Sequence, residues 1–285
     1  MVAKVIDGVA IARTMRRHCR SRVEALQSRS GFTPGLAVIL VGENPASLLY
    51  VRNKIRACEE VGIRSFKFGY PDSVDPELVI QQIRTLNEEP TINGILVQLP
   101  LPPSFDLGQI LRTISVDKDV DGFHLYNVGG LVVGDTVFPP CTPYGVVKLL
   151  EHEDIQLEGR NVVVVGASNI VGKPMALMLM QQDATVCICH AKTRDLAQFT
   201  ILADVLVVAA GQPRLILPQM VRMGAVVIDV GINRLPNGKL VGDVDFEGVR
   251  DKASFITPVP GGVGPMTVTM LMVNTITSAE RAARH

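Results

Sequence analysis

The sequence predicts an α/β protein made of two βα domains, the second of Rossmann type, with a cleft between them. Short β-branched runs alternate with amphipathic stretches over almost all of the 285 residues, which is the pattern of parallel sheets. These units form two blocks, and residues 121–143 between them are rich in glycine and proline. A chain of this length also fits two domains of roughly 100–200 residues each. We expect domains over residues 1–141 and 142–266, with a last helix over residues 267–285 packing back on the first domain.

The first block begins with a helix, because apolar positions between residues 9 and 26 recur at helical spacing while arginines occupy the open face. Three apolar runs are expected strands, and two amphipathic segments between them are expected helices. The strands are residues 36–41, 65–70 and 94–98, and the helices are residues 46–61 and 75–86.

The second block contains five expected strands, spaced as in a Rossmann-type sheet. They are residues 161–165, 184–189, 204–209, 225–230 and 254–257. The stretch between the blocks shows weak periodicity, which places the domain boundary near Cys141.

Composition and charge exclude several classes of function. The chain has 28 Lys and Arg against 28 Asp and Glu, so no bulk positive field attracts nucleic acid or an anionic membrane. No apolar run approaches the ~20 residues that cross a bilayer. Five scattered cysteines without a CxxC pair argue against a disulfide framework, and Cys187, Cys189 and His190 lack the spacing of a zinc site. We expect a cytoplasmic protein with no metal site, no nucleic-acid partner and no membrane partner.

A glycine turn follows the apolar strand of residues 161–165. Gly166 permits a tight turn, Gly172 lets the next helix approach the strand, and the free N–H groups of the helix start attract a pyrophosphate. Ser168 replaces the second glycine of the G-x-G-x-x-G pattern, and one extra residue precedes Gly172. The motif alone therefore leaves a ligand-free strand-to-helix turn open.

The end of the next strand tests which dinucleotide fits. NAD recognition places a carboxylate about 20 residues after the glycine turn, but residues 189–194 contain no acid. Lys192 and Arg194 instead offer positive charge for a 2′-phosphate, although they also fit a solvated basic loop. The sequence therefore favours NADP over NAD.

Polar side chains gather near the ends of the first block's strands. Ser47, Tyr50 and Lys54 stand at i, i+3 and i+7 of a predicted helix, so a hydroxyl, a phenol and an amine share one face. That face lies just beyond the carboxyl end of a parallel strand, where open α/β sheets bind ligands. Without this position, the same spacing describes a solvated helix face. Gln98 and Asp121 lie among prolines or glycines that suit a preorganised site.

Eight short motifs run in order along nearly the whole chain. They are IDG at 6–8, YVxxK at 50–54, QLPLP at 98–102, DVDG at 119–122, PCTP at 140–143, SxIVGKP at 168–174, DVGIN at 229–233 and PGGVGPMT at 260–267. In these motifs the sequence resembles the bifunctional methylenetetrahydrofolate dehydrogenase/methenyltetrahydrofolate cyclohydrolase family. The resemblance implies an N-terminal catalytic, folate-binding domain and a C-terminal NAD(P)-binding domain. It also implies a tetrahydrofolate-derived substrate and a homodimer.

The resemblance assigns roles to individual side chains. Lys54 takes the proton-transfer role, because water attack on the methenyl carbon and opening of the intermediate to 10-formyltetrahydrofolate need a general acid or base. Tyr50 positions the folate and the lysine, Gln98 hydrogen-bonds Lys54, and Asp121 holds the pterin ring. The implied substrate contacts are Ser47, Tyr50, Lys54, Gln98, Leu99, Asp121, Pro260, Gly261, Gly264 and Pro265.

The resemblance also implies a set of cofactor contacts. They are Thr142, Gly166, Ala167, Ser168, Ile170, Val171, Ala191, Lys192 and Ile232. Many family members carry Arg at position 167 and Ser or Arg at position 191, and those side chains usually help hold the 2′-phosphate. Losing one such contact costs ~1.5–3 kcal/mol. NADP remains the expected cofactor, and NAD stays open unless Lys192 or Arg194 substitutes.

Two other interpretations remain open. A dehydrogenase of a small hydroxy acid such as shikimate has a similar two-domain build, but it does not need Tyr50, Lys54, Gln98 and the 260–265 loop together. A nucleotide-sensing protein would keep the Rossmann domain without chemistry, and intact Lys54 and Asp121 argue against it.

Overall fold

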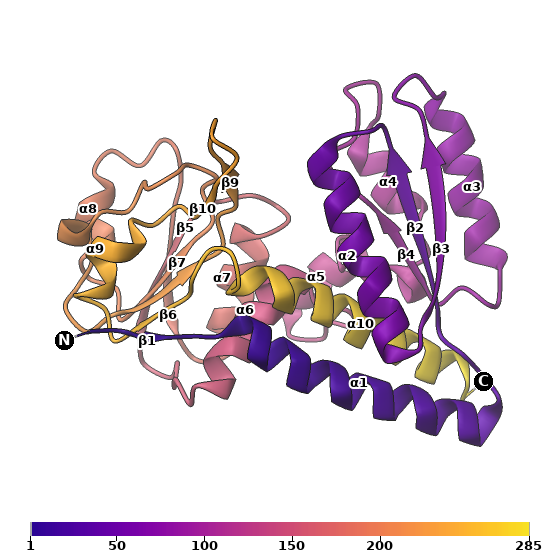
Figure 1. The fold of residues 1–285 in the computed structure, drawn as a ribbon, viewed down its shortest axis with the longest axis horizontal. Helices are drawn as coiled ribbons and strands as arrows, with labels where there is room; N and C mark the ends of the chain where they lie inside the picture. The colour runs from indigo at the N-terminus through magenta and orange to yellow at the C-terminus, as the bar shows by residue number, and fades with distance from the viewer. Residues whose placement is uncertain (1, 285) are drawn as a thin grey trace. The chain divides into compact units, whose positions relative to one another are not determined.

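The computed structural model describes residues 2–284 and divides them into two compact α/β units (Figure 1). The six-stranded unit comprises the residues up to Ala12 together with Thr142–Thr267. The three-stranded unit comprises Arg13–Cys141 together with the residues from Val268 onward. Helices α1 (Gly8–Ser30) and α10 (Val263–Ala282) each contribute residues to both units.

The three-stranded unit is built on a parallel sheet of order β3-β2-β4. Its strands are β2 (Gly35–Val41), β3 (Arg64–Tyr70) and β4 (Gly94–Val97). The central strand β2 is buried along its whole length, because it pairs on both sides and helices cover both of its faces. Since β2 and β4 are parallel neighbours, the segments that follow them begin at the same edge of the sheet.

Helices cover both faces of this sheet. Alternate β2 side chains, including Ala37 and Ile39, pack against Val79 and Ile83 of α3 and Ile110 of α4, as Figure 1 shows for the helices. Helix α2 contacts β2 and β3. The helices of this unit, besides its share of α1 and α10, are α2 (Pro45–Val61), α3 (Pro76–Glu88), α4 (Leu107–Thr113), η1 (Val116–Lys118) and α5 (Leu125–Val133).

The six-stranded unit contains a fully parallel sheet of order β1-β11-β8-β7-β5-β6. Its strands are β1 (Lys4–Val5), β5 (Asn161–Val165), β6 (Thr185–Cys189), β7 (Val205–Val208), β8 (Val226–Asp229) and β11 (Phe255–Ile256). The chain runs outward from β5 to β6 and then returns to place β7 on the other side of β5. The carboxyl end of β5 therefore lies at the topological switch point, where doubly wound sheets bind ligands.

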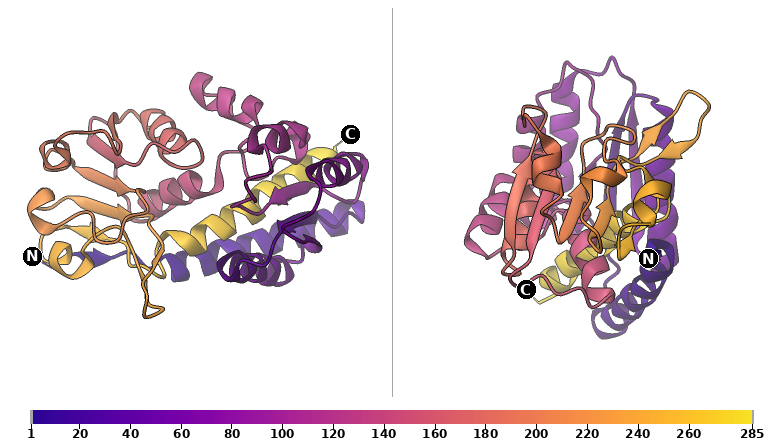
Figure 2. Two further views of the ribbon diagram at one scale, coloured as in Figure 1. Left: turned by 90° about the horizontal axis from the view of Figure 1, so that it is seen from above. Right: turned by 90° about the vertical axis from the view of Figure 1, so that its left-hand side faces the viewer.

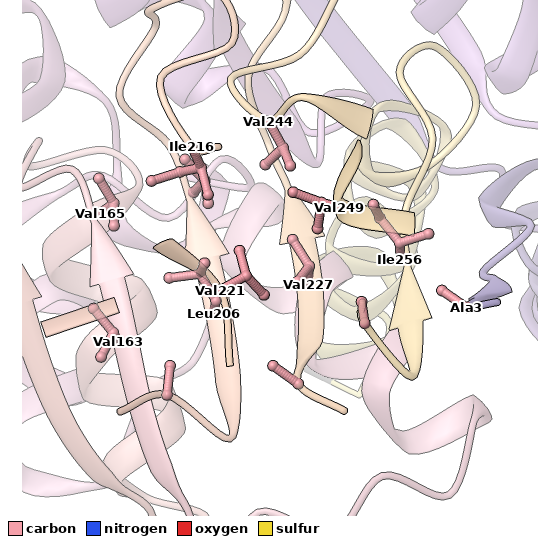
Figure 3. Close-up of a cluster of buried hydrophobic side chains, with 14 of the residues drawn as sticks. Ala3, Val163, Val165, Leu206, Ile216, Val221, Val227, Val244, Val249 and Ile256 are labelled. Carbon is pink, nitrogen blue, oxygen red and sulfur yellow. The ribbon is translucent and has the colours of Figure 1, made fainter. Parts of the chain in front are cut away.

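A hydrophobic cluster covers one face of this sheet. Figure 3 shows Val163, Leu206, Val227 and Ile256, which come from four of the parallel strands. The remaining elements are α6 (Cys141–His152), α7 (Gly172–Met180), α8 (Leu196–Thr200), η2 (Pro218–Met220), α9 (Phe246–Arg250) and the antiparallel hairpin of β9 (Asn233–Arg234) and β10 (Leu240–Val241). The hairpin projects away from the six-stranded sheet in every view (Figures 1 and 2).

The predicted α/β class with parallel sheets is confirmed, and the structure differs from or adds to the sequence interpretation in three details. The first twelve residues do not belong with the rest of 1–141, because β1 pairs with β11. The stretch of weak periodicity contains helix α5, which His124 caps by accepting a hydrogen bond from the Tyr126 N–H at 3.1 Å. The last helix begins at Val263, inside the range given to the second domain.

Candidate active site

One face of α2 carries the predicted hydroxyl, phenol and amine. Ser47 and Lys54 are buried, with 4% and 9% of their surface exposed, and Tyr50 is half-buried. Burial raises the pKa of the Tyr50 phenol, so the side chain stays a neutral hydrogen-bonding group. A buried lysine is costly unless a polar partner holds its charge or its protons. The face is therefore not the solvated helix surface that the spacing alone allowed.

Gln98 is that partner. Lys54 Nζ donates to Gln98 Oε1 at 3.1 Å, which is the hydrogen bond that the resemblance implied. Gln98 follows β4 directly, its backbone N–H donates to the Ile39 carbonyl, and its Nε2 donates to the Leu99 carbonyl at 2.7 Å. With its amide nitrogen held by Leu99, Gln98 presents its oxygen to the lysine.

Asp121 is half-buried and interacts electrostatically with Lys54. Burial raises the pKa of the Asp121 carboxyl, and the positive charge of Lys54 opposes that shift. Cys141 belongs to the same group, because burial and the nearby Asp121 charge both raise the pKa of its thiol. An amine, an amide oxygen, a phenol and a carboxyl thus gather at the carboxyl edge of the three-stranded sheet.

A second buried aspartate shapes the loop that carries Asp121, and the sequence analysis gave it no role. Asp119 accepts hydrogen bonds from the N–H groups of Phe123 and His124 and from Asn127 Nδ2 at 2.8 Å. Burial raises the pKa of Asp119, and these donors oppose the shift. The network closes the chain into a turn around Asp121.

Helix α10 braces the same loop through a side chain that sequence reasoning also missed. Asn274 Nδ2 donates to the carbonyls of Val120 and Pro139, at 2.9 and 3.0 Å. An asparagine among the apolar residues and threonines of a helical stretch was the available signal, because a buried amide needs partners. Asn274 and Asp119 together fix the backbone on both sides of Asp121.

The glycine turn after β5 forms a cradle that fits a dinucleotide. Gly166 has φ +124°, and a Cβ there would overlap the Ala209 carbonyl. A Cβ on Gly172 would overlap the Gly166 carbonyl. Ser168 Oγ accepts a hydrogen bond from the Val171 N–H at 3.1 Å. Ser168 is exposed and lies just before the start of α7. Backbone N–H groups at such a helix start suit phosphate oxygens.

The loop after β6 carries the predicted basic residues. His190 Nδ1 accepts from the Lys192 N–H at 3.1 Å, which closes a tight turn. Ala191, Lys192 and Arg194 are exposed, and within residues 2–284 neither basic side chain makes an ion pair. The loop thus offers two cations without an ion pair, while Ala191 and, in the cradle, Ala167 offer no polar side chain.

The other predicted residues of the six-stranded unit lie close to one another. Thr142 Oγ1 and Thr267 Oγ1 are 3.0 Å apart, and Ile232 is 45% exposed. A Cβ built on Gly264 would lie 3.8 Å from Ile232 Cδ1, so the first turn of α10 meets a predicted cofactor contact. The predicted residues therefore fall into two sets, one in each unit.

The described residues contain neither a metal-binding cluster nor a membrane-spanning helix. In the part of the chain that the structure describes, no group of three or more His, Cys, Asp or Glu side chains is arranged to hold a metal ion. No helix among the described residues is long and apolar enough to span a membrane.

A glycine cradle at the switch point of one parallel sheet and a buried lysine–amide pair on another define a two-domain, nucleotide-dependent enzyme. The chain belongs to the tetrahydrofolate dehydrogenase/cyclohydrolase family. Residues 6–121 match the model of the family's catalytic domain, and residues 140–283 match its NAD(P)-binding domain. It is an enzyme of one-carbon folate metabolism.

Known relatives agree over the whole chain. The bifunctional protein FolD of Nitrosospira multiformis is 58% identical over 99% of this chain and 98% of its own length. The crystal structure of FolD from Campylobacter jejuni superposes with a TM-score of 0.96 at 50% identity, covering 98% of this chain and 99% of that one. A Trypanosoma brucei FolD, complexed with NADP and an inhibitor, gives 0.97 at 40% identity with full coverage of both. The family resemblance and the enzyme class are confirmed.

Proposed function

We propose that this protein oxidises 5,10-methylenetetrahydrofolate to the methenyl compound with NADP and then hydrolyses that product to 10-formyltetrahydrofolate. The hydrogen bond from the buried Lys54 to Gln98 is the observation that carries the proposal, because a buried amine held by an amide oxygen at the carboxyl edge of the sheet supports a role in proton transfer. Relatives at 55–58% identity are named as bifunctional, which supports both activities.

The oxidation step needs positioning more than acid–base chemistry. Bound NADP supplies a hydride acceptor. Removal of hydride from the carbon between two folate nitrogens leaves a cation that the nitrogen lone pairs stabilise. Tyr50 and Asp121 hold the folate ring, and the neighbouring Ser47 and Leu99 complete the pocket. Proximity and orientation of this kind account for large rate effects without a proton donor.

The hydrolysis step needs proton transfer. Water adds to the methenyl carbon and loses one proton. The hydroxyl of the adduct then loses its proton while the leaving folate nitrogen gains one, and the carbon–nitrogen bond opens to give the formyl product. Lys54 handles these protons through Nζ, while the Gln98 oxygen holds one Nζ hydrogen and so fixes the amine's direction. The family resemblance supports Pro260, Gly261, Gly264 and Pro265 as further substrate contacts; the first two precede α10, and the last two lie in its first turn.

The residues of the six-stranded unit fit the dinucleotide. The glycine cradle with Ala167, Ser168, Ile170 and Val171 receives the pyrophosphate, and Ile232 and Thr142 border the rest. Lys192, supported by Arg194, faces the 2′-phosphate in place of the usual arginine and serine. The unpaired charge of these two exposed cations supports NADP over NAD.

One spectrophotometric assay tests this function. The purified protein is mixed with methylenetetrahydrofolate and either NADP or NAD, and reduced nicotinamide and methenyl absorbance are followed separately. Shikimate and a mixture without substrate are the controls. Nicotinamide reduction followed by loss of methenyl absorbance is expected, and reduction with shikimate alone would contradict the proposal.

We propose further that the protein is a cytoplasmic homodimer formed through its six-stranded unit. Strand β6 is an edge strand, and Ile188 on it, Met180 before it and Leu202 after it are exposed by 40–62%. A second copy would pair this edge and cover these side chains. All five cysteines, which lie within residues 2–284, are free thiols, and this supports a reducing compartment. Sedimentation of wild type and Leu202→Glu tests this interface, because the substitution should lower the mass of the particle. Equal masses of the two proteins would contradict the interface.

A further inference from the structure

Two buried aspartates lie beneath the carboxyl edge of the six-stranded sheet and have no role in the proposed chemistry. Asp229 ends β8, and Asp243 follows the β9–β10 hairpin. Both are almost fully buried, at 3% and 0% exposure. Among the described residues neither makes an ion pair with a Lys, Arg or His side chain, so backbone and amide donors alone satisfy them. Burying two carboxylates without a cationic partner costs free energy, so their position must provide something to the fold around them.

Asp243 joins two loops that are separate in the sequence. Its Oδ2 accepts from the N–H groups of Ala210 and Gly211, at 2.7 and 2.8 Å, in the loop after β7. Its Oδ1 accepts from Asn233 Nδ2 at 2.8 Å, at the end of the loop after β8. One carboxylate therefore fixes the positions of both loops.

Asp229 and two glycines hold Asp243 in place. Asp229 accepts from the N–H groups of Gly231, Asp243 and Val244 at 2.9–3.0 Å. A Cβ on Gly231 would overlap the Asp243 carboxyl, and a Cβ on Gly242 would overlap that of Asp229. Glycine at these two positions therefore leaves the space that the two carboxylates occupy.

The loops that Asp243 joins lie at the carboxyl edge of the six-stranded sheet, next to the proposed NADP contacts. The residue before Ala210 is Ala209, whose carbonyl lies against Gly166 of the glycine cradle. The residue before Asn233 is Ile232, one of the proposed cofactor contacts. The cradle and both loops thus follow the carboxyl ends of β5, β7 and β8, and the buried Asp243 connects the two loops.

We propose that Asp243 is a positioning residue for NADP, which holds the loops after β7 and β8 in the arrangement that the dinucleotide needs. This inference rests on the proposed function. Asp243 does not act on the reacting atoms; it acts through Ala210, Gly211 and Asn233.

A swap of two side chains tests the geometry directly. In Asp243→Asn, a single amide oxygen replaces two acceptors, so either the two backbone N–H groups or Asn233 loses its partner. In the double variant Asp243→Asn/Asn233→Asp, the new amide accepts from the backbone and donates to the new carboxylate, which restores every bond. Asp245→Asn, two residues away with no side-chain capping bond, is the matched control for charge.

Three measurements use these variants. Calorimetry of the nucleotide-free protein gives the Kd for NADP, amide exchange reports on Ala210 and Gly211, and hydrolysis of methenyltetrahydrofolate without nucleotide reports on the other unit. For Asp243→Asn we expect Kd to rise at least about tenfold, amide exchange to accelerate, and hydrolysis to stay near wild type. The swap should recover most of the affinity, and the control should match wild type.

The inference would be overturned by an Asp243→Asn protein with wild-type Kd and exchange rates, or by a swap no better than the single variant. A single variant that fails to fold leaves the swap as the decisive comparison, since recovered folding without recovered affinity would also overturn it. A wild-type protein that binds no NADP would instead contradict the proposed function. That absence of binding would be measured before any substitution is made.

Discussion

Lys54 Nζ lies 3.1 Å from Gln98 Oε1, although 44 residues separate the two in the chain. Lysine and glutamine meet because β2 and β4 are parallel neighbours, so that helix α2 and the segment after β4 start from the same edge of the sheet. The Gln98 amide nitrogen is held by the Leu99 carbonyl, which leaves its oxygen for the lysine. The pair is thus fixed by the sheet and not by the helix alone.

Replacing Lys54 tests the proton-transfer role. Lys54→Met keeps an unbranched side chain, one atom shorter, but removes the amine, so hydrolysis of methenyltetrahydrofolate should fall by about 10²-fold or more while the protein stays folded. The measurement is the decay of methenyl absorbance, with circular dichroism to check folding. Lys67→Met, on the exposed side of β3, is the control. Retained hydrolysis by Lys54→Met would remove Lys54 from the mechanism.

Replacing Gln98 tests how the lysine is held. Gln98→Met has a similar shape but no oxygen for Lys54 Nζ, and losing a hydrogen bond to a charged group costs about 1.5–3 kcal/mol. We therefore expect kcat for hydrolysis to drop by about ten- to a hundredfold, with a smaller change in KM. Gln109→Met on the exposed surface of α4 serves for comparison. An unchanged kcat would show that the hydrogen bond is incidental.

The glycine cradle gives a prediction that separates the two activities. A methyl group in Gly166→Ala would overlap the Ala209 carbonyl and would sit on a backbone with φ +124°. We expect affinity for NADP to fall by about tenfold or more, while nucleotide-free hydrolysis continues. Calorimetry and the methenyl assay measure the two effects. Gly129→Ala, where a Cβ meets no atom within 4 Å, is the control, and equal NADP affinity in both variants would argue against the cradle.

The basic loop after β6 predicts nucleotide preference. Lys192→Ala/Arg194→Ala should lower kcat/KM with NADP by about tenfold or more and change kcat/KM with NAD little, because only NADP carries a 2′-phosphate. Lys239→Ala, an exposed cation elsewhere in the same unit, controls for the loss of charge. Equal losses with both nucleotides would mean that the loop does not recognise this phosphate.

Asp229 predicts a pH dependence of stability. Burial raises its pKa from an ordinary value near 3.8 to about 6, although three N–H donors oppose the shift. Because the folded protein holds this proton more tightly than the unfolded chain, the contribution of Asp229 to stability is present below pH ~4 and is lost as pH rises toward 6. The difference corresponds to about 3 kcal/mol. Melting curves of wild type and Asp229→Asn from pH 4 to 7 measure it, and parallel Tm profiles would contradict it.

The sequence by itself determined most of the strands, the glycine turn and the face of α2. Four consecutive valines before Gly166 are typical of a buried parallel strand, and β5 spans Asn161–Val165 as expected. Spacing of three and four residues was enough to place Ser47, Tyr50 and Lys54 on one face of a helix. These features depend on local periodicity, which the sequence carries directly.

Only the tertiary structure decided which distant segments meet. Strand β1 is two residues long and shows no pattern, yet it pairs with β11 about 250 residues away because backbone N–H and carbonyl groups make the bonds, whatever the side chains. The same holds for Asn274, which reaches the carbonyl before Asp121, and for Asp243, which reaches two amides 32 and 33 residues earlier. A buried polar group takes the partner that the folded chain brings to it, and that partner leaves no local signal in the sequence.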